Sequence, residues 1–201
     1  MAYWKRTHTT LAAILSAALT ATLFTAPTHA KELAIWDQLQ GTNPKGYVLL
    51  MRHALAPGVG DPENFNVNDC STQRNLNEEG RQDAREIGQW LQRREVKILR
   101  VESSRWCRAK ETAQLLNIGK VRPNKNLDSL FEESDLLNHP QTANIKKRIQ
   151  SHRNTRGLLV FVGHFVNFQA VAGVSLDSGE GVLIKATPSG EFKVMGYSPK
   201  P

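Results

Sequence analysis

YVLLMRHALAPG, residues 47–58, is an apolar run that ends abruptly in Arg52 and His53 before the chain turns to Pro and Gly. A short and continuously apolar run is typical of a strand covered on both faces of a sheet. The cation and the imidazole therefore stand at the carboxyl end of a buried strand, where open α/β sheets collect their ligands. This stretch predicts a central strand that delivers two polar side chains to one edge of a sheet.

Two further strands are predicted to end in the same way. KILRVESS (residues 97–104) runs through a Ser-rich turn toward Arg108, and GLLVFVG (residues 157–163) is followed directly by His164. If the three strands are parallel neighbours, two arginines and two histidines converge where their carboxyl ends meet. Arginine supplies paired planar donors that fit a phosphate, so this cluster predicts an oxyanion pocket.

Amphipathic helices separate these strands. The strongest pattern covers residues 77–95, where Asn77 can cap the helix and apolar side chains recur on one face. Weaker helical patterns cover about 106–116 and 143–153, a short helix is expected around 34–39, and the chain closes with a predicted hairpin. Strands that alternate with helices predict an α/β protein, a three-layer α/β/α sandwich with a mostly parallel central sheet.

The first thirty residues resemble an export signal. Two basic residues precede an apolar run of fourteen residues (11–24), and small residues follow where a signal peptidase cuts. A membrane anchor is the competing interpretation, but a spanning helix needs about 20 apolar residues. We therefore expect a signal peptide over residues 1–30 that is cleaved near Ala30, one domain over residues 31–201, a periplasmic location and no stable membrane anchor.

The charge balance favours anionic ligands. The chain of 201 residues carries 26 Lys and Arg against 19 Asp and Glu, a net charge of +7. Two of the basic residues lie in the predicted leader, which leaves +5 (24 − 19) on the remainder. A nucleic-acid partner would require a concentrated basic stripe, whereas these residues are spread along the chain, and the densest run (146–148) fits a solvated helix face. Nucleic acid is therefore not an expected partner.

Both cysteines, Cys70 and Cys107, lie beyond the predicted leader. Thiols in an oxidising compartment often pair, and these two flank segments that are expected to meet at the predicted pocket. Two separate small core residues are the alternative. We expect a disulfide that pins the loop over residues 56–75, which is rich in Pro, Gly, Asn and Asp, beside Arg108.

Four blocks of the sequence, LLMRHA, RNLNEEGRQDA, SSRWCRAKETA and FVGH, resemble in order the pattern of the histidine phosphatase (phosphoglycerate mutase-like) superfamily. The resemblance covers roughly residues 46–186, and the leader and short length look most like the small exported bacterial members, including the lipopolysaccharide core heptose phosphatase type. Ala54 and Asn77 depart from the family pattern, where many members have Gly and Thr. The resemblance implies a phosphoglycerate mutase-like fold and a phosphatase that hydrolyses phosphomonoesters without a cofactor.

The resemblance also implies roles for individual residues. His53 corresponds to the nucleophile that takes the phosphoryl group and becomes a phosphohistidine. The residues that correspond to the family's phosphoryl-binding groups are Arg52, Arg108 and His164. Arg74 stands where some small members carry another basic residue, and we expect it to contact the phosphate or the substrate.

The leaving alkoxide needs a proton donor, and the family uses an acidic residue after the second helix. NLDSLFEESD (residues 126–135) offers several carboxylates, and its LFE matches the family's frequent Leu-x-Glu arrangement. Glu132 is therefore the predicted donor, followed by Glu133 and then Asp128. For most of these residues a solvated acidic loop is the alternative.

Three further expectations concern the chemistry. His53 and His164 could bind zinc, but two arginines would repel the ion and no trio of carboxylate or thiolate ligands is evident, so no metal is expected. The interval of 56 positions (164 − 108) favours hydrolysis, because the larger mutases carry an insertion there that closes over the site. The expected partner is a phosphorylated small molecule, envelope glycolipid or phosphoprotein. A phosphohistidine-protein phosphatase and a non-catalytic receptor for anionic sugars or phosphates remain the alternatives.

Overall fold

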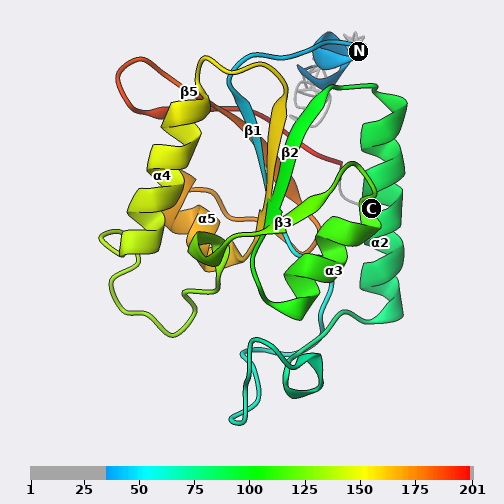
Figure 1. Cartoon of the computed structure of the whole chain (residues 1–201), viewed down its shortest axis with the longest axis vertical. Coiled ribbons are helices and arrows are strands. Elements are labelled where there is room, and N and C mark those ends of the chain that lie inside the picture. Colours follow the sequence, from blue (N-terminus) through cyan, green and yellow to red (C-terminus); the bar gives the residue numbers. More distant parts are fainter. Residues whose placement is uncertain (1–34, 200–201) are drawn as a thin grey trace, which may run out of the picture.

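The computed structural model describes residues 35–199, and its centre is one six-stranded sheet (Figure 1). A short helical segment over residues 35–39 precedes the first strand, close to where it was expected. The subsequent elements are β1 (Tyr47–Arg52), η1 (Cys70–Thr72), α2 (Glu78–Arg93), β2 (Ile98–Ser103), α3 (Cys107–Leu115), β3 (Val121–Pro123), η2 (Lys125–Leu127), α4 (Pro140–His152), β4 (Leu158–Gly163), α5 (Phe165–Ala172), β5 (Gly181–Ala186) and β6 (Phe192–Tyr197). The predicted leader lies outside the described residues.

The sheet has the strand order β3-β2-β4-β1-β5-β6. The four strands β3, β2, β4 and β1 run parallel, whereas β5 pairs antiparallel with β1 and β6 pairs antiparallel with β5. The three strands singled out in the sequence are therefore adjacent, and their carboxyl ends meet at one edge. This confirms the mostly parallel sheet and also the predicted closing hairpin, whose strands β5 and β6 lie on one side of the parallel strands.

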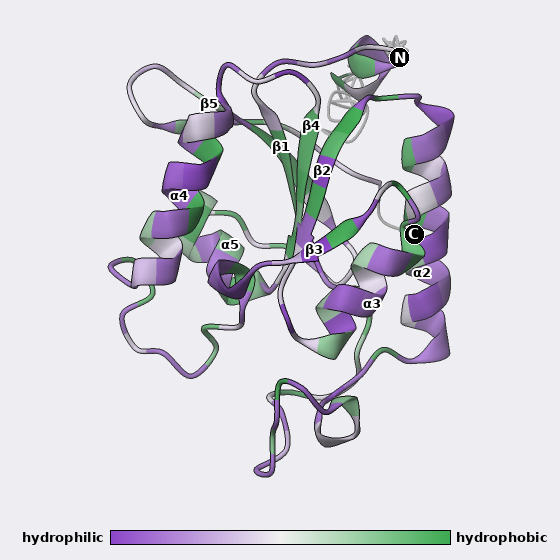
Figure 2. Cartoon of the chain, in the orientation of Figure 1, coloured by the Kyte–Doolittle hydropathy of each residue, from purple (hydrophilic) through white to green (hydrophobic). Residues whose placement is uncertain are grey.

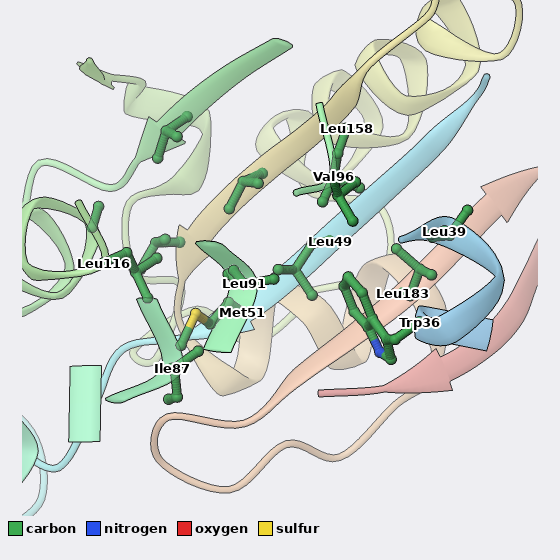
Figure 3. Close-up of a cluster of buried hydrophobic side chains, with 14 of the residues drawn as sticks. Trp36, Leu39, Leu49, Met51, Ile87, Leu91, Val96, Leu116, Leu158 and Leu183 are labelled. Atoms are coloured by element: carbon green, nitrogen blue, oxygen red, sulfur yellow. The ribbon is translucent and has the colours of Figure 1, made fainter. Parts of the chain in front are cut away.

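Helices cover both faces of the sheet. In Figure 1, α2 and α3 lie on one side and α4 and α5 on the other. Side chains of β1 alternate between the two interfaces, because Leu49 and Met51 belong to the cluster under α2 and α3, and Val48 and Leu50 belong to the cluster under α4 and α5. Figure 3 shows the first cluster, and Figure 2 shows apolar strands between helices with polar outer faces. The predicted three-layer α/β/α sandwich is confirmed.

Helix ends are explained by local chemistry. The predicted cap of α2 is present, since the Asn77 side chain accepts a hydrogen bond from the Gly80 N–H at 2.8 Å. Helix α4 begins at Pro140, three positions before the predicted start, because proline is well suited to the first turn and His139 caps it. Within residues 35–199, no helix is long and apolar enough to cross a membrane.

Candidate active site

The carboxyl ends of β1, β2 and β4 border one cavity of about 730 Å³. Its lining includes all four residues that the strand ends were expected to bring together, and Arg74 as well. Arg52 is the last residue of β1, Arg108 is the second residue of α3 after β2, and His164 directly follows β4. The parallel topology therefore places two histidines and two arginines from distant segments around one space.

The ring of His53 is fixed in one tautomer when it is neutral. Its Nδ1 lies 2.8 Å from the carbonyl oxygen of Ala54, and because a carbonyl only accepts, Nδ1 carries the hydrogen. The other ring nitrogen, Nε2, then keeps its lone pair. His53 is only 3% exposed, and burial, followed by the charges of Arg108 and Arg52, lowers its pKa to about 3 despite the opposing hydrogen bond to Ala54. The imidazole is therefore neutral at neutral pH.

The second histidine is held by a serine that the sequence analysis did not single out. The Nε2 atom of His164 lies 2.9 Å from the Ser104 Oγ, and its ring centroid is 5.4 Å from that of His53. Burial and the nearby charges of His53 and Arg108 keep the pKa of His164 well below its usual value. Ser104 belongs to the Ser-rich turn after β2, and its position at a strand end was the one signal available.

Backbone carbonyls orient two of the arginines. Arg52 donates from Nη1 to the Leu176 oxygen at 3.0 Å, and Arg74 donates from Nε to the Gly60 oxygen at 2.8 Å and from Nη1 to the Ala56 oxygen. Carbonyl oxygens hold these guanidinium groups in place without neutralising them, and the carboxylates of Asp177 and Asp61 act on Arg52 and Arg74 only through their charge. The three arginines therefore favour an anion at the end of the cavity near the strands, while Glu63, Glu132 and Glu133 also belong to its lining.

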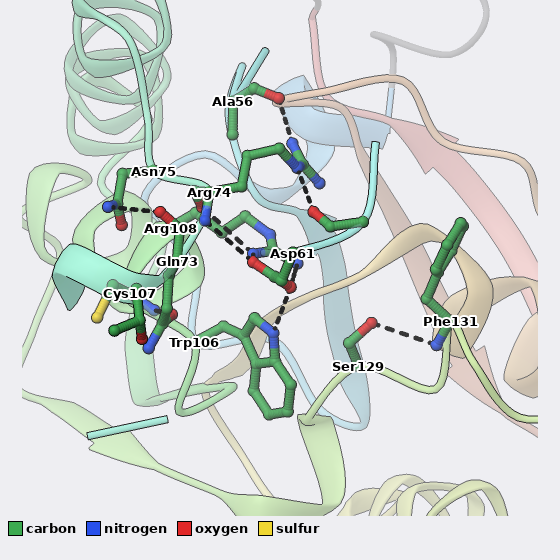
Figure 4. A network of polar contacts seen from close by, with 12 residues as sticks. Ala56, Asp61, Gln73, Arg74, Asn75, Trp106, Cys107, Arg108, Ser129 and Phe131 are labelled. Atoms are coloured by element: carbon green, nitrogen blue, oxygen red, sulfur yellow. Dashed lines mark hydrogen bonds and ion pairs between the residues drawn. The ribbon is translucent and has the colours of Figure 1, made fainter. Parts of the chain in front are cut away.

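The third arginine is paired with an acidic residue. Arg108 is 3% exposed, and its Nη1 and Nη2 atoms lie 2.7 and 3.0 Å from the two carboxylate oxygens of Asp61 (Figure 4). Burial raises the pKa of Asp61, but its hydrogen bonds to Arg108 and to the Arg74 N–H outweigh burial and keep the pKa below its usual value. Asp61, which stands in the loop after β1, was not among the predicted site residues.

Besides the hydrogen bonds of Asp61 and Arg74, three further contacts attach the loop over residues 56–75 to the start of α3. A disulfide joins Cys70 to Cys107, the residue before Arg108, with a Cα–Cα distance of 5.7 Å. The Gln73 side chain accepts from the Cys107 N–H at 2.8 Å, and Phe65 stacks on Trp106 with 4.8 Å between ring centroids. The loop thus forms a fixed wall of the cavity.

The candidate proton donors divide into two groups. Glu132 and Glu133 line the cavity and are exposed, as is Glu63, another lining carboxylate that the sequence analysis did not consider. Asp128 is buried and accepts from the Arg105 N–H at 2.9 Å and from its Nη2 at 2.6 Å, and it does not line the cavity. Asp128 therefore has a structural role. In residues 35–199, no group of three or more His, Cys, Asp or Glu side chains is placed to hold a metal ion.

Several solved structures share this fold. The protein histidine phosphatase SixA complexed with tungstate is 17% identical, with a TM-score of 0.57 over 76% of this chain and 96% of that chain. Phosphoserine phosphatase from Entamoeba histolytica, in complex with 3-phosphoglyceric acid, is 14% identical, with a TM-score of 0.56 over 77% of this chain and 97% of that chain. The putative phosphohistidine phosphatase SixA from Agrobacterium tumefaciens is 16% identical, with a TM-score of 0.52 over 79% and 99%. At these identities the likeness shows the fold.

Family membership comes from the sequence itself. No curated protein sequence matches the chain. The model of the histidine phosphatase superfamily (branch 1) matches residues 48–156, which is more than half of the chain and includes the ends of β1 and β2 that border the cavity. The chain is therefore an enzyme of the histidine phosphatase superfamily.

Proposed function

We propose that this protein is a metal-independent phosphatase that hydrolyses phosphomonoesters through a phosphohistidine formed on His53. One observation carries the proposal: a neutral His53, with Nδ1 held by a carbonyl, lines a cavity together with Arg52 and Arg108. An imidazole is a nucleophile only when it is neutral, and fixed cations stabilise the charge that develops on a transferring phosphoryl group.

The proposed reaction has two steps. The Nε2 lone pair of His53 attacks phosphorus, the bond from phosphorus to the ester oxygen breaks, and the leaving alkoxide takes a proton from a carboxylic acid. Water then attacks the phosphohistidine, inorganic phosphate leaves, and the resulting carboxylate accepts a proton from that water. In both steps Arg52, Arg108 and His164 bind the phosphoryl oxygens, because phosphoryl transfer depends on positioning and charge stabilisation.

We assign the proton donor to Glu132, with Glu133 as the second candidate. Both carboxyl groups line the cavity, whereas the carboxylate of Asp128 is bound by Arg105. Replacing the true donor by Gln should slow hydrolysis of alkyl phosphates much more than hydrolysis of p-nitrophenyl phosphate, whose leaving group needs little protonation. The same substitution at the other glutamate should affect both substrates equally.

The location and substrate are also part of the proposal. We propose that residues 1–30 are an export signal, that the domain begins near residue 31, and that the enzyme acts in the periplasm. The disulfide supports this proposal, because disulfides persist in oxidising compartments. A cavity of about 730 Å³, with the half-exposed Phe131 among its lining residues, is larger than a phosphate needs and suits bulky envelope substrates such as phosphorylated lipopolysaccharide sugars.

Hydrolysis of p-nitrophenyl phosphate by the purified protein in EDTA tests the chemistry. His53→Ala should abolish turnover, and Arg108→Ala should lower kcat/KM by about a hundredfold to a thousandfold. Arg122→Ala, on the exposed edge strand β3, is the control and should retain wild-type activity. Turnover by the wild-type protein that required an added divalent metal, or turnover that survived loss of His53, would contradict the mechanism.

A further inference from the structure

The hydrogen bonds of Arg108 show which edge of its guanidinium group is bound by other residues. An arginine has five N–H donors, and three of them have partners here. Nη1 donates to Asp61 Oδ1 at 2.7 Å and to the Arg74 oxygen at 3.3 Å, and Nη2 donates to Asp61 Oδ2 at 3.0 Å. Among the described residues, the buried Nε has no hydrogen-bond partner. The carboxylate therefore takes the edge between Nη1 and Nη2, and the edge formed by Nε and the second Nη2 hydrogen has no partner among the described residues.

Asp61 is itself fixed by several donors. Besides Arg108, Oδ1 accepts from the Arg74 N–H at 3.0 Å and Oδ2 accepts from Trp106 Nε1 at 3.0 Å (Figure 4). The side chains of Asp61 and Arg108 are 15% and 3% exposed. If the carboxylate moved away, it would leave the indole N–H and a backbone N–H without their acceptor, which is unfavourable for partly buried groups. Asp61 is therefore a stable partner of Arg108.

We propose that Asp61 is a positioning residue: it holds Arg108 by the Nη1–Nη2 edge, so that the Nε–Nη2 edge is presented to the phosphoryl group. The inference rests on the proposed phosphatase function. Both edges of a guanidinium offer two parallel N–H groups, which is the geometry that binds a phosphate through two oxygens. Asp61 acts through Arg108 and does not need to touch the substrate.

The opposite arrangement would make Asp61 a competitor of the substrate. In that case the carboxylate would occupy the phosphate position on Arg108 and would have to leave before binding. The four hydrogen bonds that Asp61 accepts, two of them from donors other than Arg108, favour the positioning role. The two arrangements predict opposite changes in phosphate affinity when the carboxylate is removed.

The kinetic test uses Asp61→Asn in the full chain. The amide keeps the size of the side chain and one acceptor oxygen but removes the charge that fixes the guanidinium. We expect kcat/KM for p-nitrophenyl phosphate to fall by about tenfold to a hundredfold, with kcat falling more than KM rises. Asp69→Asn is the matched control, because Asp69 lies in the same loop, caps η1 and does not line the cavity. It should stay within about twofold of wild type.

The binding test does not depend on turnover. Calorimetry with inorganic phosphate compares His53→Ala with the double variant His53→Ala/Asp61→Asn, and the double variant should bind about tenfold more weakly. Tighter binding by the double variant would identify Asp61 as a competitor and overturn the proposal, as would unchanged affinity with unchanged kcat/KM. Lack of wild-type turnover would instead refute the proposed function.

A third variant covers the case in which Asp61→Asn does not fold. Trp106→Phe keeps the Asp61 charge, retains an aromatic ring against Phe65 and removes one donor to Oδ2. It should lower kcat in the same direction by about threefold to tenfold. Wild-type kcat in Trp106→Phe, with the same melting temperature, would contradict the positioning role.

Discussion

His53 shows how the environment of one side chain sets its chemistry. Burial beside Arg52 and Arg108 keeps the imidazole uncharged far below the pH at which a free histidine takes up a proton. The proposed nucleophile is therefore available without a deprotonation step across the whole range near neutrality. The same environment lowers the stability of the folded protein in acid, because His53 binds a proton in the unfolded chain at a pH at which it stays neutral in the native state.

This linkage predicts a loss of stability on acidification. The pKa of His53 falls from about 6.5 in the unfolded chain to about 3 in the folded state, so the free energy of unfolding is highest above pH 7 and declines as the pH falls below 6.5. Between pH 6.5 and 5 the loss that comes from His53 is about 2 kcal/mol. Urea unfolding at pH 7, 6 and 5 measures it. His53→Gln should show a shallower decline, and a decline equal to that of wild type would contradict this explanation.

Single residues also show how far sequence reasoning reaches. The convergence of Arg52, His53, Arg108 and His164 was predicted from one regularity, because the carboxyl ends of parallel strands meet. Asp61 could not be found in this way, since it stands in an irregular loop and meets its partner 47 positions away. No periodic pattern specifies which carboxylate of such a loop faces an arginine.

At the scale of elements, glycine allows α2 to pack closely. A Cβ at Gly88 would lie 2.1 Å from the carbonyl oxygen of Leu116, just after α3, and one at Gly80 would lie 2.2 Å from the carbonyl oxygen of Leu55. In both cases the obstacle is backbone, which cannot rotate away as a side chain could. Helix α2 therefore brings α3, and with it Arg108, into a defined place beside the sheet.

Gly88→Ala tests this packing. The added methyl group must push α2 and α3 apart, and we expect the free energy of unfolding to fall by about 1–3 kcal/mol despite the better helix propensity of alanine. The exposed neighbour Gln89→Ala is the control and should stay within about 0.5 kcal/mol of wild type. Stabilisation by Gly88→Ala would show that the two helices do not approach this closely.

Elements differ in how well their sequences predict them. Residues 77–95 predicted α2 to within two residues at either end, because a cap and an apolar face coincide there. The segment over residues 121–138 has no clear helical or strand pattern in its sequence, since β3 has only three residues. Beyond β3 the chain is organised by local side-chain bonds, such as the one that the Asn126 N–H donates to Asn124 Oδ1. A strand of this length is too short to show an alternation of apolar and polar residues in its sequence.

For the whole molecule, the disulfide connects catalysis with stability. It links Cys70, in the loop that lines the cavity, to Cys107, the first residue of α3, across a sequence separation of 37. The double variant Cys70→Ser/Cys107→Ser should lose about 4 kcal/mol of unfolding free energy, because its unfolded chain regains the entropy of an open loop. Its KM for p-nitrophenyl phosphate should also rise, since Arg108 directly follows the crosslinked residue.

Denaturant unfolding and steady-state kinetics measure both effects. Dithiothreitol should reproduce the loss of stability in the wild-type protein and leave the double variant unchanged. An unchanged midpoint of unfolding in the double variant would contradict this prediction. The sequence predicted this pairing from the positions of the two cysteines beside segments that meet, and it predicted the α/β class from the alternation of strands and helices. It did not specify the order of the strands, which depends on packing between distant segments.

The position of β1 between β4 and β5 has a consequence for how such an enzyme can diversify. The proposed nucleophile, His53, directly follows a strand with neighbours on both sides, whereas much of the cavity wall comes from one surface loop. Surface loops tolerate insertion and exchange far better than interior strands do. New specificities can therefore be built by lengthening the loop over residues 56–75 between Asp61 and Arg74, while both of these residues and His53 stay where they are.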